Sequence, residues 1–405
     1  MLDVQKIRND FPALNQMVYG QPLVYFDNGA TTMKPTVVID TLEEIYSKRN
    51  SNVHRGIHYL SLRMTEEYEE ARKMVRKFIN AGSDREIIFT SGTTASINTI
   101  SSTFGEEFVK EGDEILISAM EHHSNIIPWQ VLAKRKSAIL KVIPMNDRGE
   151  IVMEKLDDLM HEGTRILAIN HVSNALGTIN PVKEIIQKAH KKNIPVLLDG
   201  AQAIPHGIVD VQDLDCDFYV FSGHKVYGPN GIGVLYGKEE WLEKLPPWQG
   251  GGDMVEKVSF EKTIYADLPF KFEAGTANYP GAVGLAKALD YIDALGRERI
   301  TAYEKELLNY ATSRLSGIDG LKIFGTAANK ISIVSFLLEG IHQEDAGMVL
   351  DKMGLAVRTG THCAEPVMTR FGIDGTVRAS MVFYNTKEEI DRLCEGLIKL
   401  RQMFR

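Results

Sequence analysis

The sequence predicts an α/β protein with a large, mostly parallel sheet and a smaller α+β domain at the C-terminal end. From about residue 114 to 199, short apolar runs alternate with amphipathic helical segments, a pattern typical of parallel strands covered on both faces by helices. After about residue 290 the alternation gives way to isolated short strands and helices. We predict an N-terminal segment over residues 1–20 that packs with the small domain, a large domain over 21–290 and a small C-terminal domain over 291–405.

Hydrophobic periodicity and turn residues place the individual elements along the chain. The expected strands, most of them short and apolar, cover residues 22–27, 86–90, 115–118, 139–144, 165–171, 195–199, 218–222, 233–237 and 331–337. The expected helices cover residues 35–48, 65–80, 183–191, 343–353 and 388–404, with others from about 93 and 124 and near 154. One long helical region over 281–315 is predicted to link the two domains.

Composition narrows the classes of partner and the compartment. The chain has 405 residues, of which 44% are apolar and 25% charged, and its net charge of −8 comes without a long basic run. These values argue against nucleic acid or an anionic membrane as the main partner. No apolar stretch has the length of a signal peptide or a membrane span. Three widely spaced cysteines exclude a disulfide framework and suit a reducing compartment, so we expect a cytoplasmic protein.

The most informative stretch surrounds Lys225. It lies in a glycine-rich loop between two apolar strands, at the carboxyl end of the first, where open α/β sheets bind their ligands. Burial there would favour the uncharged amine, which can bond covalently to an aldehyde. An ordinary surface lysine after a buried strand explains this stretch equally well.

Other polar residues also follow strands and are expected at the same sheet edge. Asp199 ends an apolar strand 26 residues before Lys225, and pyridoxal phosphate needs both a lysine for its aldehyde and an anion opposite its ring nitrogen. His122 could stack on such a ring, and the turn through Gly92 into a helix could bind its phosphate. Taken singly, each of these residues is better explained as a helix cap or a surface residue.

Cysteine and metal chemistry can also be judged from the sequence. Cys216 and Cys394 lie in apolar patterns and are expected to serve packing, whereas Cys363 lies in a polar loop with Arg358 and His362, whose positive charge would favour a thiolate. No metal-ligand spacing occurs, and Gly231-Ile-Gly233 is too short for a dinucleotide fingerprint. A nicotinamide enzyme is therefore disfavoured.

Seven motifs together resemble a known family. They begin at Tyr25, Asn52, Ser91, Glu121, Asp199, Ser222 and Arg358, and read YFDNGATT, NVHRGIH, SGTT, EHHSN, DGAQ, SGHK and RTGTHC. In this order they resemble the class V aminotransferase-fold enzymes with pyridoxal 5′-phosphate, and most closely the type II, SufS-like cysteine desulfurases. The resemblance covers essentially the whole chain and implies the aspartate aminotransferase-like fold of pyridoxal-phosphate transferases.

The resemblance also implies roles for individual residues. It makes Lys225, Cys363 and His122 catalytic, with Cys363 taking sulfur from L-cysteine as a persulfide. It implies that the cofactor is bound by Thr93, Thr94, His122, Asp199, Gln202, Ser222, His224, Lys225 and Thr276, the last contributed by the other subunit of a homodimer. It implies that the substrate is bound by Ala30, Asn174, Arg358 and Arg378. The expected sulfur acceptor is a protein of the SufE or SufU kind, and the expected use is iron–sulfur cluster assembly.

Three positions depart from the family pattern, and two other functions remain open. Gly29 stands where the family often has alanine, Ala95 where it often has an acidic residue, and Thr361 where it often has histidine. These changes concern how the cysteine loop is held and how the two subunits communicate. They leave the lysine and cysteine chemistry intact. A selenocysteine lyase or another class V lyase would have the same cofactor frame. A non-catalytic docking protein that binds pyridoxal phosphate is disfavoured by the presence of both Lys225 and Cys363.

Overall fold

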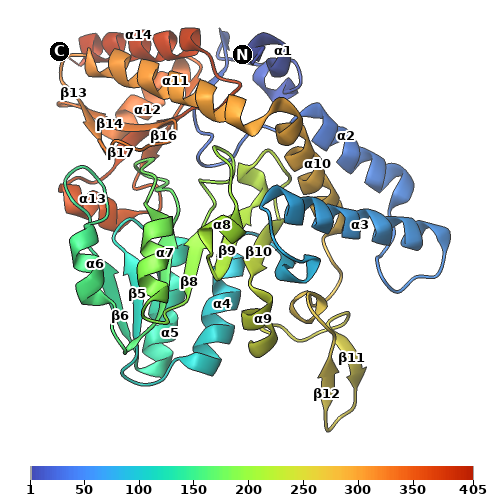
Figure 1. Cartoon of the computed structure of the whole chain (residues 1–405). Coiled ribbons are helices and arrows are strands. Elements are labelled where there is room, and N and C mark those ends of the chain that lie inside the picture. Colours follow the sequence, from blue (N-terminus) through green and yellow to red (C-terminus); the bar gives the residue numbers. More distant parts are fainter. Residues whose placement is uncertain (1, 405) are drawn as a thin grey trace.

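The computed structural model describes residues 2–404 and has two sheets of very different size (Figure 1). The larger sheet has seven strands in the order β4-β10-β9-β8-β7-β5-β6. Only β10 runs antiparallel to its neighbours, so the predicted mostly parallel α/β sheet is confirmed. Its strands are β4 (Ile87–Thr90), β5 (Glu114–Ser118), β6 (Ile139–Ile143), β7 (Thr164–Asn170), β8 (Val196–Asp199), β9 (Phe218–Ser222) and β10 (Gly233–Gly237).

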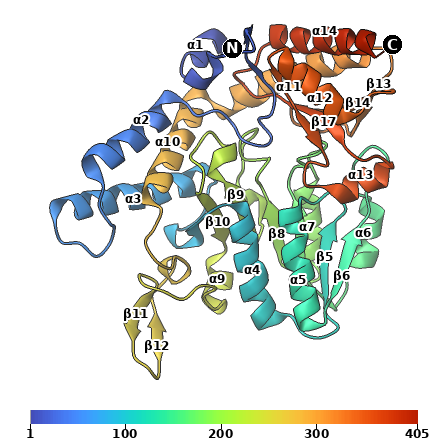
Figure 2. The ribbon, with the colours of Figure 1, turned by 180° about the vertical axis from the view of Figure 1, so that it is seen from behind.

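Helices cover both faces of this sheet because its strands are apolar on both sides. In β5, Ile115 and Ile117 pack with helices α4 and α5, whereas Leu116 packs in the core on the opposite face together with α3, α7 and α10. Figures 1 and 2 show these two layers from opposite sides. The helices of the large domain are α2 (Thr36–Glu44), α3 (Tyr59–Phe78), α4 (Thr93–Phe108), α5 (Ile127–Lys136), α6 (Met153–Leu159), α7 (Val182–His190), α8 (Val211–Leu214), α9 (Glu239–Lys244) and α10 (Tyr279–Leu295).

The smaller sheet is antiparallel, with strand order β13-β14-β17-β16, and forms the small α+β domain. Val24 and Phe26 from the start of the chain are buried in its core, and β3 pairs in parallel with β15. The strands are β13 (Leu321–Phe324), β14 (Ile333–Leu338), β15 (Leu355–Ala356), β16 (Arg358–Gly360) and β17 (Thr376–Ser380), and the helices are α11 (Arg297–Ser316), α12 (Gln343–Lys352), α13 (Glu365–Phe371) and α14 (Lys387–Met403). The N-terminal elements are α1 (Val4–Arg8), β1 (Met17–Val18), β2 (Gln21–Pro22) and β3 (Val24–Tyr25).

The structure corrects several predicted elements. The expected single helix over 281–315 is two helices, because Gly296 ends α10 and adopts φ +91°, a conformation that a helix cannot continue through. Helix α3 begins six residues before the predicted start at Thr65, and α2 ends in a π-helical turn over Ile45–Arg49. The expected strand over 22–27 is reduced to the short strands β2 and β3.

A two-stranded hairpin, β11 (Val255–Val258) and β12 (Thr263–Tyr265), projects away from the large sheet (Figures 1 and 2). Its tip exposes Phe260 completely, and Trp248 before it is also exposed. Such apolar side chains on a protruding element are typical of an interface with another chain. None of the helices in residues 2–404 has the length and apolar character needed to cross a membrane.

Candidate active site

A cavity of about 210 Å³ lies at the carboxyl ends of the large-sheet strands, beneath the small domain. It brings together most of the predicted site residues, which come from strand ends and from the small domain. The predicted residues that line it are Ala30, Thr93, Thr94, His122, Asn174, Asp199, Gln202, Ser222, His224, Lys225, Arg358 and Arg378. Cys363 and Thr276 are not among the lining residues.

Lys225 ends a 3-10 turn that follows β9. Two residues that follow strand β3 hold this turn in place. The carbonyl oxygen of His224 accepts hydrogen bonds from Thr31 Oγ1 at 3.0 Å and from Lys34 Nζ at 2.9 Å. Gly233 is required beside the turn, because a Cβ there would lie 2.4 Å from Gly92 Cα. Burial lowers the pKa of Lys225 from its ordinary 10.5 to about 8, although Asp199 acts in the opposite direction. The fold therefore favours a substantial fraction of uncharged amine.

Asp199, at the end of β8, is 5% exposed and lines the same cavity. Its Oδ1 accepts the N–H of Ala201 at 3.0 Å. Burial raises its pKa, which the Ala201 N–H and the Lys225 ammonium oppose. The structure thus places one carboxyl group and one lysine from adjacent strands in one cavity, as the strand-end argument predicts.

His122 follows β5 and is held as a neutral ring. Burial and the neighbouring positive charges, Lys225 first among them, lower its pKa to about 3. The backbone N–H of Ser124 donates to His122 Nδ1 at 3.1 Å, so Nδ1 is unprotonated and the proton lies on Nε2. The ring can stack on a planar group while it presents an N–H donor.

The start of α4 has the features of a phosphate-binding site. Ser222 Oγ accepts the N–H of Thr93 at 2.8 Å, and Thr94 Oγ1 and Ser124 Oγ are 2.7 Å apart. Within residues 2–404, the N–H groups of Thr94 and Ala95 have no hydrogen-bond acceptor. Free N–H groups at the positive end of a 16-residue helix, beside several hydroxyl groups, suit a phosphate.

Two arginines, Arg358 and Arg378, also line the cavity. Arg378, from β17, is 1% exposed and donates to Asn174 O at 2.9 Å and to Asp27 Oδ1 at 3.1 Å. Burial lowers its pKa to about 10, which still leaves it charged at neutral pH. Arg358 lines the same cavity, and Arg378 Nε is a buried donor without an acceptor among the described residues. The two arginines therefore suit a carboxylate ligand.

Gln202 and Ala30 also line the cavity. Gln202 Nε2 donates to Gly29 O at 2.7 Å, which uses one of its two N–H groups and leaves the other for a ligand. A Cβ at Gly29 would lie 3.0 Å from Arg378 Nη2, so this departure from the family pattern gives the arginine slightly more room. Together, a lysine, a buried carboxyl group, a stacking ring and a phosphate site fit pyridoxal phosphate.

Cys363 lies just outside the lined cavity. It and His362 adopt left-handed conformations, each with φ +56°, in the turn between β16 and α13. The Cys363 carbonyl oxygen accepts the N–H of His123 at 2.9 Å, and Asn174 Nδ2 donates to the His362 carbonyl at 2.7 Å. Cys363 is also close enough for its charge to raise the pKa of Lys225. The cysteine loop is therefore tied to the cavity wall on both sides.

Thr276 lies elsewhere, on a second cavity of about 340 Å³ that it shares with Ala95 and Trp248. Its side chain is exposed, and no described residue hydrogen-bonds its hydroxyl group. It is not among the residues that line the first cavity of its own chain.

The sequence-based selection missed several lining residues, namely Gly29, Ser124, Asn170, Val172, Ala201 and His362. Asn170 ends β7, so the strand-end rule that selected Asp199 could have found it. Ser124 and His362 lie inside motifs already recognised. Asp27 ends a predicted strand and lies in the first motif, but its pairing with Arg378 left no local signal because the two residues are 351 positions apart.

Comparison with known proteins gives a consistent result. The family model described as Aminotransferase class-V matches residues 24–393. A cysteine desulfurase of Synechococcus elongatus is 51% identical over 399 residues, covering 98% of this chain, which spans only 64% of that relative's length. A cysteine desulfurase of Cronobacter sakazakii is 48% identical, covering 99% of this chain and 98% of the relative. The solved apo structure of a cysteine desulfurase from Thermococcus onnurineus superposes with a TM-score of 0.94 at 38% identity, covering 100% of this chain and 99% of that one.

The family match covers most of the chain, and the structural likeness covers all of it. The predicted aspartate aminotransferase-like fold of pyridoxal-phosphate enzymes is thereby confirmed. The chain belongs to the class V aminotransferase family.

Proposed function

We propose that this protein is a cysteine desulfurase that converts L-cysteine to L-alanine and takes the sulfur as a persulfide on Cys363. The observation that carries the proposal is the placement of Cys363 beside a cavity that holds a buried Lys225 and two carboxylate-binding arginines. The cysteine desulfurases among its relatives support the same activity. The cofactor is pyridoxal 5′-phosphate, as the sequence predicts.

When bound, pyridoxal phosphate supplies an electron-accepting ring next to the substrate α-carbon. Thr93, Thr94, Ser222 and His224 would hold its phosphate, with Thr276 of a second subunit, while Gln202 and Asp199 would contact the ring. Lys225, with a pKa near neutrality, is suited to remove and return a proton at Nζ. His122 would stack on the ring and donate from Nε2. Ala30, Asn174, Arg358 and Arg378 would orient the substrate, with its carboxylate at the arginines.

The sulfur step uses Cys363. Its thiolate Sγ bonds to the substrate sulfur as the substrate carbon–sulfur bond breaks, and that electron pair stays with the carbon, which is then protonated. Cysteine and one enzyme thiol thus yield alanine and one enzyme persulfide, without an external oxidant or reductant. Because the cysteine loop is short and tied to the cavity wall, an acceptor protein must come to it.

We further propose a homodimer, an acceptor of the SufE or SufU kind, use of the sulfur in iron–sulfur cluster assembly and a cytoplasmic location, as the SufS-like resemblance implies. A dimer is supported by the exposed Ile57, Tyr59 and Leu62 and by the hairpin with Phe260, apolar side chains that a second copy would cover. The division into residues 1–20, 21–290 and 291–405 remains a prediction.

The decisive experiment compares the wild-type protein with Cys363→Ala and Cys394→Ala in the presence of L-cysteine and a thiol. We expect the wild type and Cys394→Ala to form alanine and Cys363→Ala to form none while it keeps the cofactor absorbance. Mass mapping should place the persulfide on Cys363. Normal turnover by Cys363→Ala would refute the persulfide mechanism, and a wild type that binds no pyridoxal phosphate would refute the cofactor assignment.

A further inference from the structure

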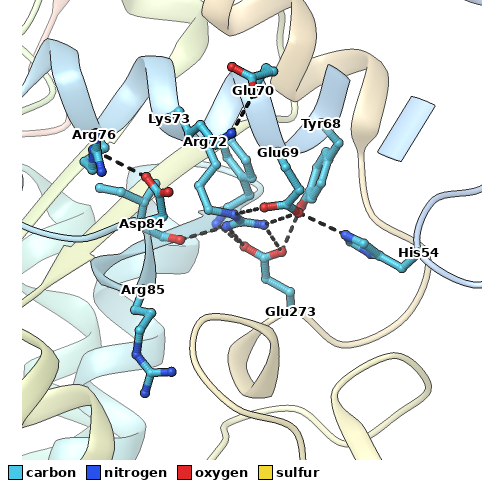
Figure 3. A network of polar contacts seen from close by, with 12 residues as sticks. His54, Tyr68, Glu69, Glu70, Arg72, Lys73, Arg76, Asp84, Arg85 and Glu273 are labelled. Carbon is cyan, nitrogen blue, oxygen red and sulfur yellow. Dashed lines mark hydrogen bonds and ion pairs between the residues drawn. The ribbon is translucent and has the colours of Figure 1, made fainter. Parts of the chain in front are cut away.

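A buried polar network lies away from the first cavity, between α3 and the segment that precedes α10 (Figure 3). At its centre, Arg72 of α3 donates from Nη1 to Glu273 Oε1 at 2.7 Å and from Nη2 to Glu273 Oε2 at 3.0 Å. The side chains of the two residues are 1% and 7% exposed. They are 201 positions apart, so this pair joins two distant parts of the chain.

Every hydrogen-bonding position of the Glu273 carboxylate is used. Besides the two bonds from Arg72, Oε1 accepts the N–H of Phe89 at 2.7 Å and Oε2 accepts the hydroxyl of Tyr68 at 2.8 Å. The remaining donors of Arg72 go to Glu69 and to the carbonyl of Ile87. A carboxylate with four donors has one orientation, so the backbone at Glu273 is fixed as well.

The burial of this ion pair needs an explanation, because removing two charges from water costs solvation free energy. Apolar residues of similar volume often stabilise a fold equally well. Burial opposes the charge of Arg72, yet the pKa of Arg72 is raised, chiefly by Glu273. The guanidinium also lies 4.8 Å from the ring centre of Phe89. The best-attested use of such a buried pair is to fix the position of the segment that it holds.

The segment held in this way carries Thr276. On its other side, Asn278 Nδ2 donates to Gly231 O at 2.7 Å, and the N–H of Gly275 donates to Gly252 O at 2.9 Å. The backbone from Glu273 to Asn278 is thus anchored at both ends. Between the anchors it presents the exposed Thr276 hydroxyl group, which is outside the cofactor cavity of its own chain.

We propose that Glu273, held by Arg72, is a positioning residue that places the Thr276 hydroxyl group for the cofactor phosphate bound in the partner subunit. The inference rests on the proposed function, in which the protein is a dimer that binds pyridoxal phosphate across its interface. It adds that α3 and β4 of one subunit set the cofactor affinity of the other.

The test measures the dissociation constant of pyridoxal phosphate from the apoprotein, by titration, for the wild type, Thr276→Ala, Glu273→Gln and the double variant. Losing one hydrogen bond to a charged group predicts about tenfold weaker binding for Thr276→Ala. Glu273→Gln should weaken binding by a similar factor, and the double variant should bind no more weakly than Thr276→Ala alone. Unchanged affinity in Glu273→Gln, or two factors that multiply in the double variant, would overturn the proposal.

Glu69→Gln is the matched control, because Glu69 also pairs with Arg72 but belongs to α3 and does not hold the Thr276 segment. Its cofactor affinity should equal that of the wild type, even if its melting temperature falls. If Glu273→Gln does not fold, Tyr68→Phe removes one of the four donors to Glu273, and its smaller loss of affinity should vanish in the Thr276→Ala background.

Different experimental results would contradict the positioning role of Glu273 and the desulfurase activity. A wild type that is monomeric by sedimentation at the titration concentration would overturn the role of Glu273. A wild type whose cofactor affinity shows the predicted coupling but which forms no alanine from cysteine would overturn the desulfurase activity alone.

Discussion

The lowered pKa of Lys225 makes a quantitative prediction about how the apoprotein takes up its cofactor. Burial brings this pKa from 10.5 to about 8. At pH 7 a lysine of pKa about 8 has roughly a tenth of its amine uncharged, whereas one of pKa about 10.5 has about three parts in ten thousand. Only the uncharged amine bonds to an aldehyde, so the structure predicts a rate of attachment some 300-fold above that of an ordinary lysine at equal intrinsic reactivity.

The assay follows covalent attachment of pyridoxal phosphate to the apoprotein at limiting cofactor, trapped with borohydride, across a range of pH. The rate should rise about tenfold per pH unit and level off near pH 8, where the amine is mostly uncharged. Nα-acetyl-lysine, measured with the same cofactor, is the control for ionisation of the cofactor itself. A protein rate that keeps rising with pH as the control amine does would refute the lowered pKa.

Substitution of the neighbouring carboxylate tests the cause of the shift. Asp199 raises the pKa of Lys225 against the effect of burial. Asp199→Asn keeps the burial and removes the charge, so the rate should level off at a lower pH than in the wild type. The pH at which the rate levels off, rather than the rate itself, is the measurement, because Asp199 is also expected to contact the cofactor. A shift to higher pH would contradict the proposed electrostatics.

Two further predictions concern Arg378 and the half-buried ion pair between His190 and Asp217. Arg378→Lys should raise the KM for cysteine about tenfold with unchanged cofactor affinity, because an ammonium cannot match the planar fork of donors; steady-state kinetics that show an unchanged KM would contradict this. The hydrogen bond to Asp217 raises the pKa of His190, against burial, so the pair stabilises the fold fully below the unfolded pKa of about 6.5 and loses this contribution as pH rises through the folded pKa. His190→Gln should therefore lower Tm more at about pH 5.5 than at about pH 9, and an equal loss at both would argue against the pair.

Most of the first cavity could be predicted from the sequence for a simple geometric reason. In a mostly parallel sheet the carboxyl ends of the strands meet at one edge, so a polar residue directly after an apolar strand is already assigned to the site. Asp199, His122 and the start of α4 were found in this way, and the structure places all three with Lys225. The resemblance to the family supplied the rest, including Arg358 and Arg378.

Other features needed the tertiary structure. The break at Gly296 between α10 and α11 was missed because the helical periodicity continues across it. The pairing of Asp27 with Arg378 leaves no local trace in the sequence, since the two residues belong to different ends of the chain. Residues that meet only after folding follow no periodicity, and no spacing rule can pair them.

The sequence by itself singled out Lys225 and Cys363 as candidates, since each lies in an unusual loop, and the resemblance to the family gave them their expected roles. Only the folded chain decided that Cys363 lies beside the cavity that holds Lys225, and that Thr276 lines a different cavity. The physical reason is that strand, helix and loop types follow from local patterns of apolar residues, whereas the distance between two loops depends on how whole sheets and helices pack.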